Sequence, residues 1–143
     1  MRTIKFRAKT KQGEWVYGNY VHHYTTYFEK QEHHSIFIPD VDAKNSHWAE
    51  DVNTDTLGQF TGSYDKNRNE IYEGDILRFG NSPSGVCEVK WNKRITAFCV
   101  RFYFECNLGS RPLGEWVMCE RSVEIIGNVH DNPELLKGGK NEK

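Results

Sequence analysis

DTLGQFTGSYDKNRNEIYEGDIL, residues 55–77, contains the turn that separates the two halves of this chain. At its centre, residues 65–70 are six consecutive polar or charged side chains between apolar neighbours. Asn and Asp hydrogen-bond their own backbone and tolerate left-handed conformations, so this segment predicts a turn. The alternating residues 75–79 then predict a new strand. We therefore predict that the turn joins an N-terminal β unit, residues 1–64, to a C-terminal unit, residues 65–136.

The C-terminal unit is predicted to be a small SH3-like β-barrel, which makes the fold class mainly β. Short runs between turn residues predict five strands, at 75–79, 86–91, 96–104, 115–118 and 123–129. Five strands at this spacing suit a small barrel. One helical turn is expected at residues 132–136, with Asn132 as its cap and Pro133 at its first position. The last residues, 137–143, are predicted to be a disordered tail.

The N-terminal unit is predicted to begin with a β-hairpin. Residues 4–8 alternate apolar and polar side chains, and the aromatic-rich run 15–21 supplies the second strand. Residues 22–34 are too polar for a core strand throughout and predict a long excursion with loop histidines. Residues 35–38 predict a strand that stops before a proline, which lacks the backbone donor. Residues 40–51 predict a loop with a helical turn around 47–49.

Three motifs in order resemble the YopX family of small phage and prophage proteins. The central signature is carried by Gln59-Phe60-Thr61-Gly62, Asp65-Lys66-Asn67 and Glu70-Ile71-Tyr72-Glu73-Gly74-Asp75-Ile76. The opening residues 1–8 and the closing residues 124–136 are similar to the two ends of that family. Two departures stand out: Arg68 occupies a position where the family usually has Gly, and Ser63-Tyr64 replaces a Leu-Lys-like pair.

The resemblance implies a phage or prophage accessory protein of uncharacterised role in the cytoplasm of a bacterial host. It also implies a set of structural signature residues. These are Gly62, Asp65, Asn67, Tyr72, Gly74, Asp75, Gly127, Asn128 and Pro133.

The amino-acid composition limits which kinds of partner and which cellular compartment are expected for this protein. The net charge is −1, with 19 basic and 20 acidic residues interspersed, so binding to phosphate backbones would require a local patch. The four cysteines contain no Cys-x-x-Cys pair, which argues against a four-cysteine zinc site and for reduced thiols. Neither a leader-like apolar segment nor an apolar run of about 18 residues occurs in the sequence. A cytoplasmic protein is expected, with no membrane partner and no cofactor.

Catalytic and metal-binding patterns are weak. Cys87 and Cys99 lie in alternating strand patterns and are interpreted as packed thiols rather than nucleophiles. Glu73 and Asp75 are interpreted as turn residues rather than paired carboxylates, with Gly74 supplying an unusual backbone angle. No hydrolase elbow, phosphate loop or His-Glu-x-x-His segment occurs. We therefore expect no enzyme activity and no catalytic residues.

Two features of the sequence resemble ion-binding sites. The Asp-x-Asn-x-Asn run starting at Asp65 resembles a calcium loop, but its sixth position is Glu70 and its twelfth is Ile76, where Gly and Glu are required. Adjacent histidines on a strand point to opposite faces and cannot share one ion. Only a cross-strand meeting of His22 with His33 or His34 would build a metal site. No metal site is predicted, and this meeting stays open.

The remaining functional interpretation is that the protein carries a binding surface. The predicted hairpin from Lys90 to Tyr103 interleaves basic and aromatic residues, a composition suited to single-stranded nucleic acid. Its candidate binding residues are Lys90, Trp91, Lys93, Arg94, Arg101 and Tyr103, beside Phe102. The favoured interpretation is that the aromatic side chains fill the barrel core. The predicted function is a non-catalytic protein-binding or assembly module with an unknown phage or host protein as partner; nucleic-acid binding and homo-oligomerisation stay alternatives.

Overall fold

The structure, a computed structural model, describes residues 1–39, 49–80, 85–103, 110–119 and 122–136. It is mainly β, as the sequence predicted, and divides into two compact units, Met1–Phe60 and Thr61–Lys143. The division falls inside one long strand, four residues before the boundary predicted from the sequence. The predicted tail, 137–143, and the predicted helical turn at 47–49 lie outside the described residues, except for Ala49.

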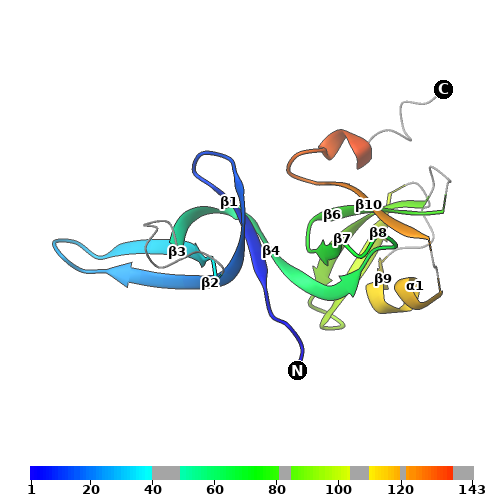
Figure 1. The fold of residues 1–143 in the computed structure, drawn as a ribbon, viewed down its shortest axis with the longest axis horizontal. Coiled ribbons are helices and arrows are strands. Elements are labelled where there is room, and N and C mark those ends of the chain that lie inside the picture. Colours follow the sequence, from blue (N-terminus) through cyan, green and yellow to red (C-terminus); the bar gives the residue numbers. More distant parts are fainter. Residues whose placement is uncertain (40–48, 81–84, 104–109, 120–121, 137–143) are drawn as a thin grey trace. The chain divides into compact units, whose positions relative to one another are not determined.

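The first unit is built from four antiparallel strands that close on themselves (Figure 1). The strands are β1 (Phe6–Thr10), β2 (Trp15–Thr25), β3 (Gln31–Phe37) and β4 (Ala49–Tyr64), whose last residues enter the second unit. β1 pairs with both β2 and β4, and β3 pairs with β2 and β4. The core of the unit contains Ala8, Ile36 and Val52, with Phe6, Val16, Tyr20, Ile38 and Leu57 packed around them.

The predicted excursion at residues 22–34 is wrong, because most of it continues the β2–β3 ladder. The pairing runs without a break from Asn19↔Phe37 to Thr25↔Gln31. Polar side chains are compatible with strands when both faces of a hairpin meet water. The predicted loop at 40–51 also ends too late, since β4 begins at Ala49.

The second unit carries a five-stranded antiparallel sheet in the order β10-β6-β7-β8-β9, after the short strand β5 (Glu70–Tyr72), which pairs with the end of β4. Its strands are β6 (Asp75–Phe79), β7 (Val86–Asn92), β8 (Ala97–Phe102), β9 (Ser110–Pro112) and β10 (Val123–Asn128). Four strands follow one another as a meander, and the last returns beside the first. This is the strand order of the SH3-like barrel that the sequence predicted.

The predicted strand at 115–118 is wrong, because α1 (Leu113–Cys119) occupies it. The fourth strand is β9, which lies between the predicted strands at 96–104 and 115–118. Leu113 is buried in the core and Val117 packs against that core. These two residues are four apart, a spacing that places them on one helical face. The segment therefore has helical rather than strand periodicity.

Buried side chains of the sheet and α1 form the second core: Ile71, Leu77, Phe79, Cys87, Val89, Val100, Phe102, Leu113 and Val123. The chain ends its described part in the 3₁₀ turn η2 (Pro133–Leu136), which confirms the expected helical turn. The side-chain oxygen of Asn132, the predicted cap, accepts the N–H of Asn128, a residue of the preceding turn.

Candidate functional site

The basic and aromatic residues predicted as a nucleic-acid surface divide between two faces of the β7–β8 hairpin. Trp91 pairs with Phe98 and shares its face with the buried pair Val89 and Val100. Lys90, the preceding residue on β7, points to the opposite face. Trp91 and Phe98 meet edge to face, with ring centroids 5.0 Å apart. Lys90 and Trp91 therefore do not form one continuous surface.

The Lys90 face carries its own counter-charge. Glu88 accepts a hydrogen bond from the Tyr103 hydroxyl at 2.8 Å and pairs with Lys90 at 3.5 Å. The Arg101 guanidinium lies over the Tyr103 ring, 5.4 Å from its centroid. Burial, followed by the contact with Glu88, raises the pKa of Tyr103 to about 12. Glu88 thus weakens the positive field of Lys90 and Arg101.

The turn of the same hairpin keeps exposed cations. Lys93 and Arg94 are exposed, and Trp91, beside them in sequence, is 48 % exposed. Arg94 donates its backbone N–H to the side chain of Asn92, which fixes the turn and leaves the guanidinium outside this contact. Of the six predicted binding residues, the structure thus groups Trp91, Lys93 and Arg94 at the hairpin end and the other three on the opposite face.

The sequence analysis missed an aromatic surface at the tip of the β2–β3 hairpin. Tyr27 and Phe28, which lie between the two strands, are 94 % and 101 % exposed, the highest values of any aromatic residue described. Tyr24 is half exposed on β2, and the Lys30 ammonium lies 4.2 Å from the centroid of its ring. The sequence feature that indicates this surface is an adjacent pair of aromatic residues inside a polar turn. Because a turn has no buried strand face, such a pair is not expected to pack into the core.

The four histidines of this hairpin form two stacked pairs on opposite faces. His22 lies opposite His34 and His23 lies opposite His33, with ring centroids 4.4 Å and 5.1 Å apart. The first pair converges on Glu32, and these three side chains offer ligand atoms within 4.8 Å of one another. The cross-strand meeting of His22 with His34, left open by the sequence, is therefore present.

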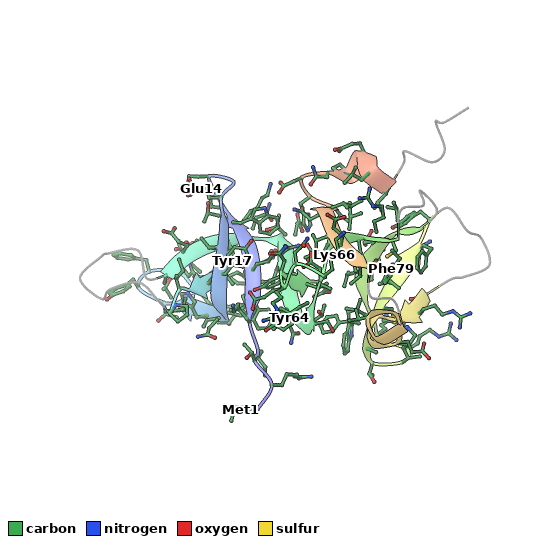
Figure 2. All side chains as sticks on the ribbon, turned by 45° about the vertical axis from the view of Figure 1, so that its right-hand side comes forward. Met1, Glu14, Tyr17, Tyr64, Lys66 and Phe79 are labelled. Carbon is green, nitrogen blue, oxygen red and sulfur yellow. The ribbon has the colours of Figure 1, made fainter. Side chains whose placement is uncertain are left out.

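The central signature forms a hydrogen-bonded turn around Asp65. One carboxylate oxygen accepts the N–H groups of Asn67 at 2.9 Å and Asn69 at 2.8 Å. The other accepts the N–H of Ile125 on β10 at 3.2 Å. Arg68 has a φ of 65°, so the residue that departs from the family pattern occupies a left-handed position. Tyr64 and Lys66 mark the turn in Figure 2.

The rest of the central signature also supports the backbone. Asp75 is buried and accepts the N–H of the buried Tyr72 at 2.7 Å. Gly74, between them in a left-handed conformation with φ of 89°, donates to the Val89 carbonyl and accepts the N–H of Val129. Gly62 has a similar φ of 88°. These residues hold turns together through their backbone contacts.

The C-terminal signature is a tight turn. Asn128 accepts the N–H groups of His130 and Asp131 through its side-chain oxygen. A Cβ on Gly127 would lie 2.6 Å from the side-chain oxygen of Asn132, so a larger residue there would require the Asn132 side chain to shift. Pro133 then opens η2. The segment fixes the return of β10.

A cavity of about 560 Å³ lies in the first unit. It is mostly apolar and lies between the start of the chain and β2, where Tyr17 is labelled in Figure 2. Among the described residues that line it there is no carboxylate, imidazole or thiol. Its lining residues are Thr3, Ile4, Lys5, Trp15, Val16, Tyr17, Gly18, Asn19, Ile38 and Pro39.

Two of the cysteines are packed thiols. Cys87 and Cys99 have no exposed surface. Burial raises the pKa of Cys87 to about 12, which keeps it as an unreactive thiol near neutral pH. Cys106 lies outside the described residues, and the side chain of Cys119 is not described.

Comparison with known proteins agrees with the three signature motifs. The family described as "YopX protein" matches residues 5–137. The crystal structure of protein EF1440 from Enterococcus faecalis is similar in fold, with a TM-score of 0.56, 23 % sequence identity, and coverage of 95 % of this chain and 99 % of that chain. No curated protein matches this chain in sequence. Among the described helices, none has the length and apolarity needed to span a bilayer. The family match covers almost the whole chain, and the protein belongs to the YopX family.

Proposed function

We propose that this protein is a non-catalytic binding module, encoded by a phage or prophage and acting in the host cytoplasm, which docks onto another protein through the tip of its β2–β3 hairpin. The observation that carries the proposal is the nearly complete exposure of Tyr27 and Phe28. Family membership supports an accessory role and leaves the partner open.

The chemistry of the tip suits insertion into an apolar pocket of a partner protein. Two adjacent aromatic rings exposed to water are unfavourable in free energy, and burial in a complex removes this unfavourable contribution. Aromatic residues are also enriched among the residues that dominate binding energy. The rings are bordered by Thr26, Glu29 and Lys30, which supply a polar rim.

The hairpin beneath the tip is anchored in the first unit. Ile36 on β3 is fully buried in the core, and Ser35 donates its hydroxyl to Asp51 on β4 at 2.9 Å. The ladder continues outward from there to Thr25↔Gln31. Docking through a pre-formed hairpin avoids part of the ordering cost that a disordered segment incurs on binding.

The test is a comparison of baits in lysate of the bacterium that carries the gene, treated with nuclease. The full-length protein is compared with the double variant Tyr27→Ser, Phe28→Ser. The matched control is Ile95→Ser, which removes an exposed apolar side chain from a turn in the second unit. We expect a protein that the wild type and the control capture and the double variant does not.

The purified partner then gives the affinity. Loss of both rings should weaken binding by roughly several hundred-fold, because buried aromatic anchors contribute about 2 kcal/mol each and about 1.4 kcal/mol corresponds to a factor of ten. Equal capture by all three baits would overturn the proposal. Light scattering of the purified protein shows whether the partner is a second copy of the chain or a different protein.

A second candidate function is nucleic-acid binding by the end of the β7–β8 hairpin. The observation that favours it is the half-exposed Trp91 beside the exposed Lys93 and Arg94. A ring for base stacking next to two cations suits a single strand. Affinity for a single-stranded oligonucleotide should fall steeply with salt, and Lys93→Glu with Arg94→Glu should abolish it. Absence of binding at low salt would reject this candidate.

A further inference from the structure

We propose that His22, Glu32 and His34 form a binding site for a divalent transition-metal ion, with Zn²⁺ as the best fit, on one face of the β2–β3 hairpin. This site is separate from the aromatic tip and does not depend on the proposed docking function.

The register of the hairpin brings the three side chains to one face. His22 on β2 lies directly opposite His34 on β3, and Tyr24 lies opposite Glu32. Directly opposite residues share a face, and residues two apart on a strand share it as well. His22, His34 and Glu32 are therefore neighbours by topology, and a change of register would be needed to separate them.

The ligand atoms already converge. One oxygen of Glu32 lies 2.7 Å from Nε2 of His22 and 3.2 Å from Nε2 of His34. The three ligand atoms lie within 4.8 Å of one another. A tetrahedral ion with bonds of about 2.0–2.2 Å places its ligand atoms roughly 3.3 Å apart, so small rotations of the side chains suffice to admit one.

A hydroxyl on the same face holds one imidazole in a metal-binding orientation. The Tyr20 hydroxyl lies 2.6 Å from Nδ1 of His34. When Nδ1 carries the proton and donates it to this oxygen, the lone pair of Nε2 points toward Glu32 and is available to an ion. A hydrogen bond at the second ring nitrogen is the usual support of a histidine ligand. The Tyr20 and His34 rings are nearly parallel, at 4°.

The ligand set selects the class of ion. Two imidazole nitrogens and one carboxylate oxygen suit Zn²⁺ and its neighbours Ni²⁺, Co²⁺ and Cu²⁺. Mg²⁺ and Ca²⁺ prefer oxygen ligands throughout and are disfavoured here. Three protein ligands leave a fourth position open, for water or for a side chain of a binding partner. His22 and Glu32 are 39 % and 54 % exposed at their side chains, so an ion can enter from solvent.

Binding of the ion would link β2 and β3 in a region where, among the described residues, these two strands pair only with each other. β3 pairs with β4 at Ser35–Phe37, and β1 pairs with β2 no further than Gly18. Across residues 22–25 and 31–34, the described pairing is two-stranded. Isolated two-stranded ladders are marginally stable in water. A metal link between His22 and His34 would therefore stiffen the part of the hairpin that carries the tip.

The other face of the same hairpin provides matched controls. His23 and His33 also stack, but their ring nitrogens contact the Ser35 hydroxyl at 3.2 Å and the Thr25 hydroxyl at 3.0 Å. His23→Gln thus removes an imidazole next to His22 in sequence without touching the proposed site.

The experiment is calorimetric titration of Zn²⁺ into the full chain after chelator treatment and removal of any affinity tag. We expect one ion per chain for the wild type and for His23→Gln. Affinity should be weaker by roughly tenfold or more for His22→Gln, His34→Gln and Glu32→Gln, each of which removes a ligand. Glu32→Gln keeps the size and hydrogen-bonding capacity of the residue, so it serves if a histidine variant fails to fold.

Two further readouts fix the location. Co²⁺ should give the visible absorption of a tetrahedral site in the wild type and lose it in Glu32→Gln. Amide hydrogen exchange in residues 22–25 and 31–34 should slow when Zn²⁺ is added. Absence of stoichiometric binding to the wild type, or equal affinity for the wild type and Glu32→Gln, would overturn the proposal.

Discussion

A carboxylate oxygen of Asp65 accepts the backbone N–H of Ile125 at 3.2 Å, across 60 residues of sequence. The same side chain closes its own turn through Asn67 and Asn69. The contact is reinforced by the Lys66 N–H, which donates to the Val123 carbonyl at 2.9 Å. The turn at Asp65 therefore also holds β10, the last described strand of the second unit, in place.

Asp65→Ala should destabilise the protein by about 2–3 kcal/mol, because it leaves backbone N–H groups at a buried site without their charged acceptor. Chemical denaturation at neutral pH measures the loss. The control is Asp55→Ala, since Asp55 is an exposed residue of β4. Equal stability of the two variants would show that the turn is held by other contacts.

The same residue predicts a dependence of stability on pH. Burial alone would raise the pKa of Asp65, but hydrogen bonds from Asn69, Ile125 and Asn67 outweigh it and lower the pKa below its usual value. A carboxyl with a depressed pKa in the folded state stabilises the fold fully above its unfolded pKa, about 3.9. The advantage of wild type over Asp65→Asn should shrink as pH falls through the lower, folded-state pKa. Urea unfolding at several acidic pH values would reveal a constant difference if the prediction is wrong.

Arg68→Gly should stabilise the protein by about 0.5–1 kcal/mol. Arg68 has a φ of 65°, a conformation that costs an L-residue roughly 1–2 kcal/mol and costs glycine none, offset in part by the greater chain entropy of glycine when unfolded. Thermal unfolding measures the gain. Arg68→Ala keeps the strained backbone and serves as the control; a gain of equal size in that variant would assign the effect to the lost guanidinium.

Gly18→Ala should destabilise the protein by about 2 kcal/mol or more. A Cβ at Gly18 would lie 2.0 Å from the Phe37 carbonyl oxygen, so the β2–β3 pairing would have to shift. Gly114→Ala is the control, because a Cβ there meets nothing within 4 Å and the residue lies in α1, where alanine is favoured over glycine. Denaturant midpoints that rank Gly18→Ala as the more stable variant would contradict the placement of β3.

Cys87 should resist alkylation in the native protein. Its thiol is fully buried and its pKa is raised to about 12, so both access and ionisation oppose reaction near neutral pH. Site-resolved mass spectrometry after brief iodoacetamide treatment should find Cys87 modified only when denaturant is present. Rapid native labelling at this position would place β7 outside the core.

Much of the fold follows from local sequence patterns. The run of residues 75–79, bordered by turn residues, predicts β6 with its observed bounds, although both faces of the strand are covered and only Arg78 is half-buried. Asn132 and Pro133 likewise predict the last helical turn, η2. Local patterns failed at Leu113 and Val117, since a short helix offers too few residues for its period to stand out.

The amino-acid sequence alone indicates that this chain is mainly β and turns at Asp65, because turn chemistry and strand alternation are local properties. Its motifs also show the resemblance to the YopX family. The contact of His22 with His34 and Glu32, and the separation of Trp91 from Lys90, emerge only in the three-dimensional fold. Both outcomes depend on strand register, which places each side chain on one face or the other. Register is set by contacts between distant segments, and a single strand read alone does not contain it.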